Sequence, residues 1–265
     1  PLYKLQQYYY SPTDIIVLGD SRANHLSKES FDSIANEEIT NLAYGAGTIE
    51  EIVETFWIVN EIHKLKKIYI GINFNLYNAL NARNTVSEAN ELRKSKVSYI
   101  TSKYCIKATF FILQSLITKK QIEIEKPPFS REEFWRHQLI TSGPDFYKNY
   151  KYPSIYYENL REISEYCSAE NIQLIFFIPP THTDLQKKIE EYNLQKENEQ
   201  FINDLSSLST NVFDFNFENN MTEDKRYFDD PFHFNQAFEQ IIIKVISSNK
   251  HNLITDNNVY KSLSR

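Results

Sequence analysis

Short apolar runs alternate with longer amphipathic stretches along most of this chain, and no other feature constrains its fold as strongly. Five runs have the continuous hydrophobicity of strands that are buried on both faces, at 14–19, 39–43, 67–73, 172–178 and 211–215. Apolar residues recur at three- and four-residue spacing in four other stretches, at 49–64, 154–170, 184–208 and 235–248. The alternation predicts an α/β fold in which a parallel five-stranded sheet lies between two layers of helices.

Residues 79–152 interrupt this alternation. They contain helical patterns at 104–118 and 131–137 but no convincing central strand. We interpret them as a helical insertion between strands three and four of a single domain over residues 1–248, followed by a polar tail at 249–265. The insertion is rich in aromatic residues, among them Trp135, Phe146 and Tyr147. These side chains either form a small core of their own or form the wall of a pocket, where their rings stack against a sugar.

Composition excludes several classes of protein. A chain of 265 residues supports a full core without disulfide or metal. Its net charge is −6 with acids and bases interspersed, so a nucleic-acid partner is not expected. The longest apolar runs have about five residues against the roughly 20 of a membrane-spanning helix, so we expect a soluble chain. Cys105 and Cys167 lie in helical patterns and are interpreted as two buried thiols in preference to a disulfide.

No cofactor or metal is expected either. The sequence has no His-x-x-x-His or Cys-x-x-Cys spacing for a metal ion. Gly45 and Gly47 form a Gly-x-Gly pair, but the third glycine and the Lys-Ser/Thr ending of a phosphate-binding loop are missing.

Glycine is scarce, and four of the five glycines lie within or just after expected strands: Gly19, Gly45, Gly47 and Gly71. The carboxyl ends of parallel strands form the crevice where ligands bind, and glycine lets the backbone turn sharply there. Together these positions predict a ligand site at this edge of the sheet.

Side chains suited to acyl chemistry also lie just after the expected strands or before the last expected helix. Gly19-Asp20-Ser21 supplies a hydroxyl, and Asp230-Pro-Phe-His233 supplies a base with a carboxylate three residues away. The run from Gly71 to Asn75 supplies two carboxamides, which donate hydrogen bonds without carrying charge. Two alternatives compete with this set. His182, with Asp184 two residues on, is a rival base, and Asp229 is a rival to Asp230.

In their order along the chain, these blocks resemble the four sequence blocks of the SGNH (GDSL-type) hydrolases, over residues 19 to 233. The blocks are Gly19-Asp20-Ser21, the stretch from Asn41 to Gly47, Gly71-Ile-Asn73, and Asp230-Pro-Phe-His233. The surrounding residues are similar to a cell-envelope branch, the SGNH-like domains of polysaccharide O-acetyltransferases and teichoic-acid D-alanylation proteins. The features in question are Leu18-Gly-Asp-Ser-Arg22, Pro179-Pro-Thr-His182 and Phe228-Asp-Asp-Pro-Phe-His-Phe234.

The resemblance implies a three-layer, flavodoxin-like α/β/α fold and a role for each matching residue. Ser21 would be the nucleophile, His233 the base and Asp230 its orienting carboxylate. The Ser21 N–H, the N–H of Gly45 or Ala46, and the Asn73 amide would form the oxyanion hole.

This sequence departs from the family pattern at two positions. Counting from Asn41, the family spacing places alanine at the oxyanion glycine, Ala46, and Phe74 replaces the Asp that often follows Asn73. Asn75, His182 and Trp135 are further candidates for contact with substrate.

The function implied is that of a serine-dependent acyl-ester hydrolase or O-acyltransferase that acts on a small ester, an acylated carbohydrate or a cell-envelope glycan. The alternative is a non-catalytic envelope-binding module on the same fold. The resemblance also implies an extracytoplasmic or cell-envelope location. The chain begins at Pro1 and its one methionine is Met221, so we expect a processed product or a cloned fragment. If an N-terminal anchor preceded it, a membrane acyl-transfer partner is expected as well.

Overall fold

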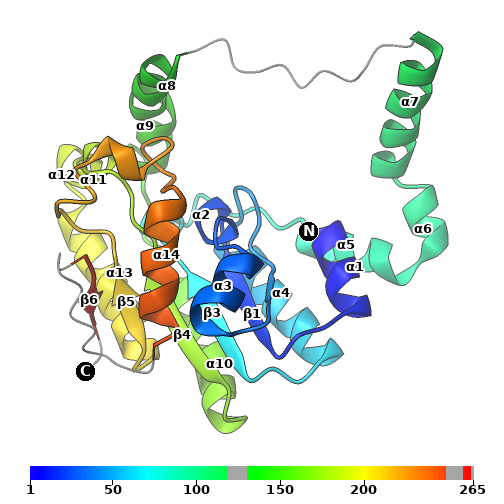
Figure 1. Ribbon diagram of the computed structural model, residues 1–265, viewed down its shortest axis with the longest axis horizontal. Helices are drawn as coiled ribbons and strands as arrows, with labels where there is room; N and C mark the ends of the chain where they lie inside the picture. The colour runs from blue at the N-terminus through cyan, green and yellow to red at the C-terminus, as the bar shows by residue number, and fades with distance from the viewer. Residues whose placement is uncertain (119–129, 249–258, 264–265) are drawn as a thin grey trace.

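In the computed structural model, which describes residues 1–118, 130–248 and 259–263, a six-stranded sheet lies between two layers of helices (Figure 1). The strands are β1 (Ile15–Gly19), β2 (Ile39–Asn41), β3 (Lys67–Gly71), β4 (Gln173–Ile178), β5 (Val212–Asp214) and β6 (Lys261–Ser262). Their order is β2-β1-β3-β4-β5-β6, with the first five parallel and β6 antiparallel to β5. The five predicted strands are confirmed, in the order typical of a flavodoxin-like sheet.

The register of the central strands determines where a ligand site can form. Ile15 pairs with Lys67 and Gly19 pairs with Gly71, so β1 and β3 end side by side. The chain leaves β1 toward β2 on one side and returns to β3 on the other, which makes the gap between β1 and β3 the topological switch point of the sheet. Segments that follow these two strands therefore meet at one crevice.

The helices between the strands lie close to where periodicity predicts them. They are α1 (Leu2–Tyr10), α2 (Ser21–Asn24), α3 (Lys28–Ala35), α4 (Ile49–Ile62), α5 (Val86–Lys94), α6 (Lys96–Ile100), α7 (Lys103–Thr118), α8 (Arg131–His137), the π-helix η1 (Gln138–Ser142), α9 (Gly143–Tyr147), α10 (Ser154–Ala169), α11 (Thr183–Gln186), α12 (Lys188–Glu191), α13 (Gln195–Leu208), the 3₁₀-helix η2 (Lys225–Tyr227) and α14 (Gln236–Ile246). The single helix predicted over 184–208 is wrong, because the chain forms α11, α12 and α13 there. Asn193 adopts the left-handed conformation (φ 57°) just after α12 and ends that helix.

Alternate residues of each strand enter different hydrophobic layers, as strands buried on both faces require. Ile16 and Leu18 of β1 belong to the core that α4, α10 and α13 cover. Val17 belongs to the core beneath α3 and α14, where it lies with Phe31 and Phe238. The three-layer α/β/α architecture is therefore confirmed.

Between β3 and β4, the described residues of the insertion form helices joined by turns and irregular segments, and they contain no strand. Tyr147 and Tyr150 pack their rings on Phe74 of the main core, with centroid separations of 6.2 and 4.4 Å. The hypothesis that these aromatics form a separate small core is therefore wrong. Helix α7, in contrast, has no buried residue.

The tail predicted over 249–265 is only partly described, since residues 249–258 and 264–265 lie outside the described residues. Val259 is nevertheless buried, and Lys261–Ser262 form the sixth strand, which the sequence did not predict. Two polar residues give no periodic signal, and β6 exists because its backbone pairs with β5. Cys105 and Cys167 are both free thiols, but only Cys167 is buried, because Cys105 lies on helix α7, which has no buried residue. In the described ranges, no helix has the length and hydrophobicity to cross a membrane.

Candidate active site

Ser21 is the first residue of α2, immediately beyond the carboxyl end of β1. Its neighbour Asp20 caps this short helix by accepting a hydrogen bond from the Arg22 N–H at 2.9 Å. The tight passage from strand to helix requires glycine at position 19, where φ is +148°. A Cβ there would lie 2.5 Å from the Ala23 Cβ and 2.7 Å from the Gly71 oxygen. The backbone thus presents the half-buried Ser21 side chain at the switch point of the sheet.

His233 lies opposite Ser21, on the loop that precedes α14. Its Nε2 is 2.8 Å from Ser21 Oγ, and its Nδ1 is 2.8 Å from Asp230 Oδ2 and 3.0 Å from Asp230 Oδ1. The structure therefore brings together the serine, histidine and carboxylate that the sequence analysis singled out. It does so across 212 residues of chain.

Asp230 is held as a carboxylate. Burial by itself would raise its pKa, but hydrogen bonds from the His233 ring and from the Phe232 and His233 N–H groups outweigh burial, and the net pKa is lowered. A charged Asp230 accepts from Nδ1–H, which assigns the tautomer in which Nε2 is free to accept the Ser21 proton. This arrangement suits a general base that acts on a serine hydroxyl.

The rival residues lie elsewhere. His182 is buried, accepts the Asp184 N–H at Nδ1 (3.1 Å) and is 3.1 Å from the Glu223 carbonyl at Nε2. Asp229 makes its hydrogen bond to His233 through its backbone N–H, which donates to the His233 carbonyl. Neither residue takes the place of His233 or Asp230.

Trp135, proposed from the sequence as a substrate contact, is also placed differently. The side chain is buried, donates from Nε1 to Asp184 Oδ2 at 3.1 Å and packs edge-on against His182. Lys225 and Arg131 lie over its ring, with separations of 4.7 and 5.4 Å. Trp135 and His182 thus stabilise each other, and neither lines the cavity beside Ser21.

That cavity has a volume of about 360 Å³ and opens beside the Ser21 and His233 side chains. Part of its wall comes from the insertion, through Gln138, Ser142 and Phe146. The remaining lining residues are Asp20, Arg22, Ala46, Gly47, Asn75, Leu76, Asn81 and Phe232. The insertion therefore does form a wall of the crevice. Of the aromatic residues named above, Phe146 lines the cavity, whereas Trp135 and Tyr147 do not.

The turn after β2 contributes main-chain groups to this cavity. Ala46 and Gly47 line it, whereas Gly45 does not. Ala46 adopts the left-handed conformation (φ 52°), and its carbonyl accepts from Arg83 at 2.6 Å. Within the described residues, the Ser21 and Ala46 N–H groups make no hydrogen bond. Of the two alternatives from the sequence, the geometry favours the Ala46 N–H over that of Gly45 as an anion donor.

The next helix fixes this turn. Thr48 and Glu51 form a capping box at the start of α4, with reciprocal hydrogen bonds of 3.2 Å. Glu51 is buried and also accepts from the Thr85 N–H and hydroxyl, at 3.0 and 2.6 Å, and lies 3.4 Å from Arg83. One carboxylate thereby holds both the helix end and the arginine that binds the Ala46 carbonyl.

The carboxamides after β3 differ from the expectation. Asn73 is buried, donates from Nδ2 to the Pro179 carbonyl at 2.7 Å, and does not line the cavity. Its Oδ1 is buried without a hydrogen-bond partner. The structure therefore does not place the Asn73 amide beside Ser21, and this part of the predicted oxyanion hole is corrected.

Asn75 lines the cavity in its place. Its Oδ1 accepts from Arg22 Nη1 at 2.9 Å, while its Nδ2 makes no hydrogen bond within the described residues. Arg22 is itself buried and pairs with Asp20 through Nε and Nη2. Because Arg22 can only donate, it orients the Asn75 amide with its oxygen toward the guanidinium and leaves the NH₂ group for a ligand.

Sequence reasoning assigned no role to Arg22. It was noted only as part of the run Leu18–Arg22. An arginine directly after Ser21, two residues beyond the end of a strand expected to be buried, is the signal that points to it, because a buried arginine needs dedicated acceptors.

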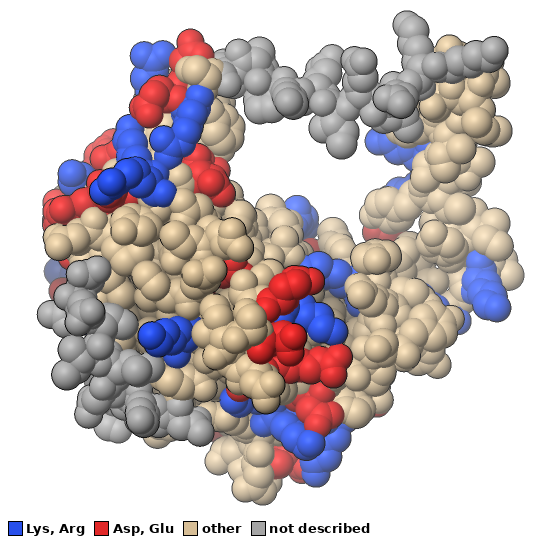
Figure 2. All heavy atoms as spheres, in the orientation of Figure 1, with Lys and Arg blue, Asp and Glu red and all other residues tan. Residues whose placement is uncertain are grey.

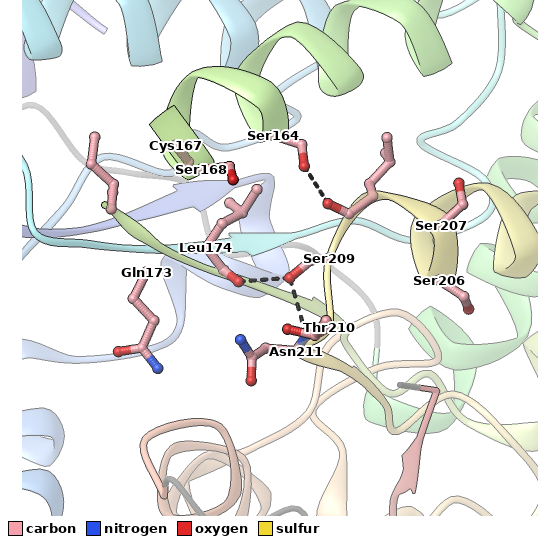
Figure 3. A pocket seen from close by; sticks show the side chains of 12 residues that line it. Ser164, Cys167, Ser168, Gln173, Leu174, Ser206, Ser207, Ser209, Thr210 and Asn211 are labelled. Atoms are coloured by element: carbon pink, nitrogen blue, oxygen red, sulfur yellow. Dashed lines mark hydrogen bonds between the residues drawn. The ribbon is translucent and has the colours of Figure 1, made fainter. Parts of the chain in front are cut away.

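A larger cavity of about 620 Å³ lies at the opposite edge of the sheet, where α10 and α13 end and β4 begins (Figure 3). Several of its hydroxyls already bind main-chain groups. Ser209, for example, donates to the Leu174 carbonyl at 2.8 Å. Cys167 is its one titratable lining residue, and burial raises the pKa of this thiol to about 12. The cavity therefore offers no base or reactive nucleophile. Within the described residues, no cluster of His, Cys, Asp or Glu side chains is arranged to hold a metal ion.

No family model and no curated protein matches this chain. Several solved structures do match it. A candidate acylhydrolase from Bacteroides fragilis is 10% identical, with 92% of this chain and 95% of that chain covered and a TM-score of 0.48. A candidate platelet activating factor from Streptococcus pneumoniae is 12% identical, with 93% and 88% covered and a TM-score of 0.46. A candidate GDSL-like lipase from Parabacteroides merdae is 11% identical, with 88% and 92% covered and a TM-score of 0.36.

Proposed function

We propose that this protein is a serine-dependent acyl-transfer enzyme of the SGNH type, which cleaves an acyl ester and passes the acyl group to water or to a sugar hydroxyl. One observation carries the proposal. The chain of contacts from Asp230 through the His233 ring to Ser21 Oγ leads into a cavity that Ala46, Gly47 and Asn75 also line. This combination supplies a nucleophile, a base, an orienting carboxylate and anion donors.

The first half of the reaction forms an acyl-enzyme. Ser21 Oγ attacks the ester carbonyl carbon while His233 Nε2 takes the hydroxyl proton, and Asp230 stabilises the resulting imidazolium through Nδ1–H. The tetrahedral intermediate then expels the alcohol, which takes the proton from His233. The products of this half are the free alcohol and an acyl group bound to Ser21.

The second half returns the enzyme to its starting state. His233 removes a proton from the acceptor hydroxyl as its oxygen attacks the acyl carbon, and the same proton then returns to Ser21 Oγ when the ester bond to serine breaks. With water as acceptor the product is a free acid, and with a sugar hydroxyl it is a new ester.

Negative charge on the carbonyl oxygen would be stabilised by the Ser21 N–H, the Ala46 N–H and the Asn75 Nδ2. We assign the carboxamide role to Asn75 because it lines the cavity and Arg22 holds its oxygen. A donor that is held in place before the reaction acts without reorganisation when charge develops. Arg22 is a positioning residue in this scheme, since its own donors are engaged by Asp20 and Asn75.

An acylated carbohydrate or cell-envelope glycan is the substrate class we propose. The cavity combines aromatic rings, from Phe146 and Phe232, with amide and hydroxyl side chains, from Asn81, Gln138 and Ser142. This is the mixture that sugars require, because their faces are apolar and their edges are polar. The resemblance to the envelope branch supports the same class, together with an extracytoplasmic location.

Ester turnover by matched variants tests the proposal. Ser21→Ala and His233→Ala should each lower kcat/KM for p-nitrophenyl acetate by about three or more orders of magnitude, and the double variant should lose little more, because the triad acts as a unit. Ser33→Ala, which removes a serine hydroxyl on α3 that donates to the Ser30 carbonyl, is the control and should retain full activity. Acceleration by an added glycan would identify a transferase. Absence of turnover in the folded wild type would favour the non-catalytic binding module.

A further inference from the structure

Helix α7 exposes many apolar side chains that no other described residue buries. It stands away from the sheet in Figure 1, and its exposed side chains include Phe110, Ile112, Leu113, Leu116 and Ile117, each more than half exposed. Exposed apolar side chains so closely grouped are rare on a soluble domain and mark a surface that binds something.

These side chains are organised around the helix. Ile106, Phe110, Leu113 and Ile117 follow one another at four-, three- and four-residue spacing and so form one stripe, with Ile112 and Leu116 beside it. One flank of this stripe carries Lys107, Gln114 and Thr118, and the Lys107 ammonium there lies over the Phe111 ring at 5.8 Å. The helix is therefore amphipathic, with a broad apolar arc and a polar side whose charged residues are lysines.

The charge of this region is opposite to that of the rest of the chain. Residues 86–120 contain seven Lys and Arg but only two Glu, a net charge of +5. The other residues contain 22 basic and 33 acidic side chains, a net charge of −11. In Figure 2, the surface of the α6–α7 region is mostly uncharged (tan), with lysine and arginine side chains (blue). One of the two acids, Glu88, ties α7 to α5 by contacts with Lys103 (3.3 Å) and the Tyr104 hydroxyl (3.0 Å).

We propose that α7 is a membrane-surface anchor, whose apolar stripe enters the interface of a bilayer that contains anionic lipid. Amphipathic helices with lysine on the polar side bind such surfaces by apolar burial and by attraction to the lipid headgroups. An anionic bilayer fits better than an apolar protein groove. The bilayer explains both features of the region, since its interior takes up the apolar arc and its headgroups attract the lysines. Lysine stems can lie along the apolar surface while their ammonium groups reach the headgroups.

Vesicle sedimentation with the full chain tests this proposal. The wild type should bind vesicles of phosphatidylcholine mixed with phosphatidylglycerol, and added salt should weaken that binding. Phe110→Ser with Ile117→Ser should lower the partition coefficient by roughly a hundredfold, since two large apolar side chains no longer leave water. Ile34→Ser with Ile155→Ser removes exposed apolar side chains outside α7 and should leave binding unchanged.

Two further variants separate the contributions. Lys96→Gln with Lys107→Gln should lower binding to the anionic vesicles by roughly tenfold or more and leave the weak binding to pure phosphatidylcholine unchanged. A Phe110→Trp variant should show a blue-shifted emission that brominated lipid quenches. Lys96, Lys107, Phe110 and Ile117 all lie on helices without buried residues, so the melting temperature of each variant should equal that of the wild type.

Three outcomes would overturn the proposal. The wild type fails to bind the anionic vesicles, or the Phe110→Ser and Ile117→Ser variant binds as tightly as the wild type. In the third outcome, α7 mediates a concentration-dependent dimer that these substitutions abolish while vesicles are not bound, which would identify a second copy of the chain as the partner. None of these outcomes depends on ester turnover.

Discussion

Replacing Asn75 and Asn73 separately distinguishes the site that the geometry defines from the one that the sequence pattern implies. Both carboxamides follow β3, but only Asn75 lines the cavity, while Asn73 donates to the Pro179 carbonyl. We expect Asn75→Ala to lower kcat by roughly 10²–10³, which is about 2.7–4 kcal/mol of transition-state stabilisation, with a modest effect on KM. Asn73→Ala should change kcat by no more than about twofold, because no contact with the cavity is lost.

The two substitutions should also differ in stability. Asn75→Ala removes the acceptor of Arg22 Nη1, and an unpaired buried donor costs about 1–3 kcal/mol. Asn73→Ala removes one hydrogen bond, worth about 1 kcal/mol, and at the same time removes an oxygen that is buried without a partner. We therefore expect the smaller loss of unfolding free energy from Asn73→Ala.

Asn75→Asp separates the catalytic contribution from the structural one. The carboxylate still accepts from Arg22, so the protein should remain folded, but the Nδ2 donor is replaced by negative charge and kcat should fall at least as far as in Asn75→Ala. The assay is p-nitrophenyl acetate hydrolysis at saturating and low substrate, with urea unfolding of each variant. A silent Asn75→Ala combined with a 10²-fold or greater fall for Asn73→Ala would refute the reasoning.

Three other substitutions extend the test. His182→Ala should lower the melting temperature and leave the turnover of the folded fraction near that of wild type, and a loss as large as that of His233→Ala would move the base to His182. Gly19→Ala forces a Cβ to within 2.7 Å of the Gly71 oxygen at a φ of +148°, and urea unfolding should show a loss of about 2–4 kcal/mol, whereas a loss below about 0.5 kcal/mol would contradict the required glycine. Burial raises the pKa of Asp214 to about 6 from 3.8, so the folded state binds the extra proton and stability falls as pH rises from about 4 to about 6. Asp214→Asn should accordingly raise stability at pH 7 by up to about 3 kcal/mol and have little effect near pH 4, and an equal effect at both pH values would contradict this.

The sequence predicted the architecture because periodicity and hydrophobicity are averaged over many residues. Each of the first five strands contains consecutive β-branched or aromatic residues, and such a signal survives a change at any one position. The contact between Ser21 and His233 was also predictable, because each residue flanks an element whose end the sequence defines. Strand β6 was not, since two polar residues carry no such signal.

The sequence could not show that Asn75 lines the cavity while Asn73 donates to the Pro179 carbonyl, because residues 72–78 form a turn instead of a strand or helix. The Leu76 and Tyr77 N–H groups both donate to the Asn73 carbonyl, which reverses the chain between the two asparagines. A spacing of two residues does not determine which side chain faces the crevice in such a turn. The sequence also could not predict the position of the Trp135 side chain, because its partners Asp184 and Lys225 are distant in sequence.

The most direct measurement of the central claim is the reaction of the folded protein with a fluorophosphonate, followed by intact-mass measurement and peptide mapping. If His233 activates Ser21 at 2.8 Å, one adduct should form, on the peptide that contains Ser21. The rate should fall by about two or more orders of magnitude in His233→Ala, and labelling should be absent in Ser21→Ala and in urea-unfolded protein. No adduct in the folded wild type, or equal labelling of Ser21 with and without His233, would contradict the assignment of Ser21 as an activated nucleophile.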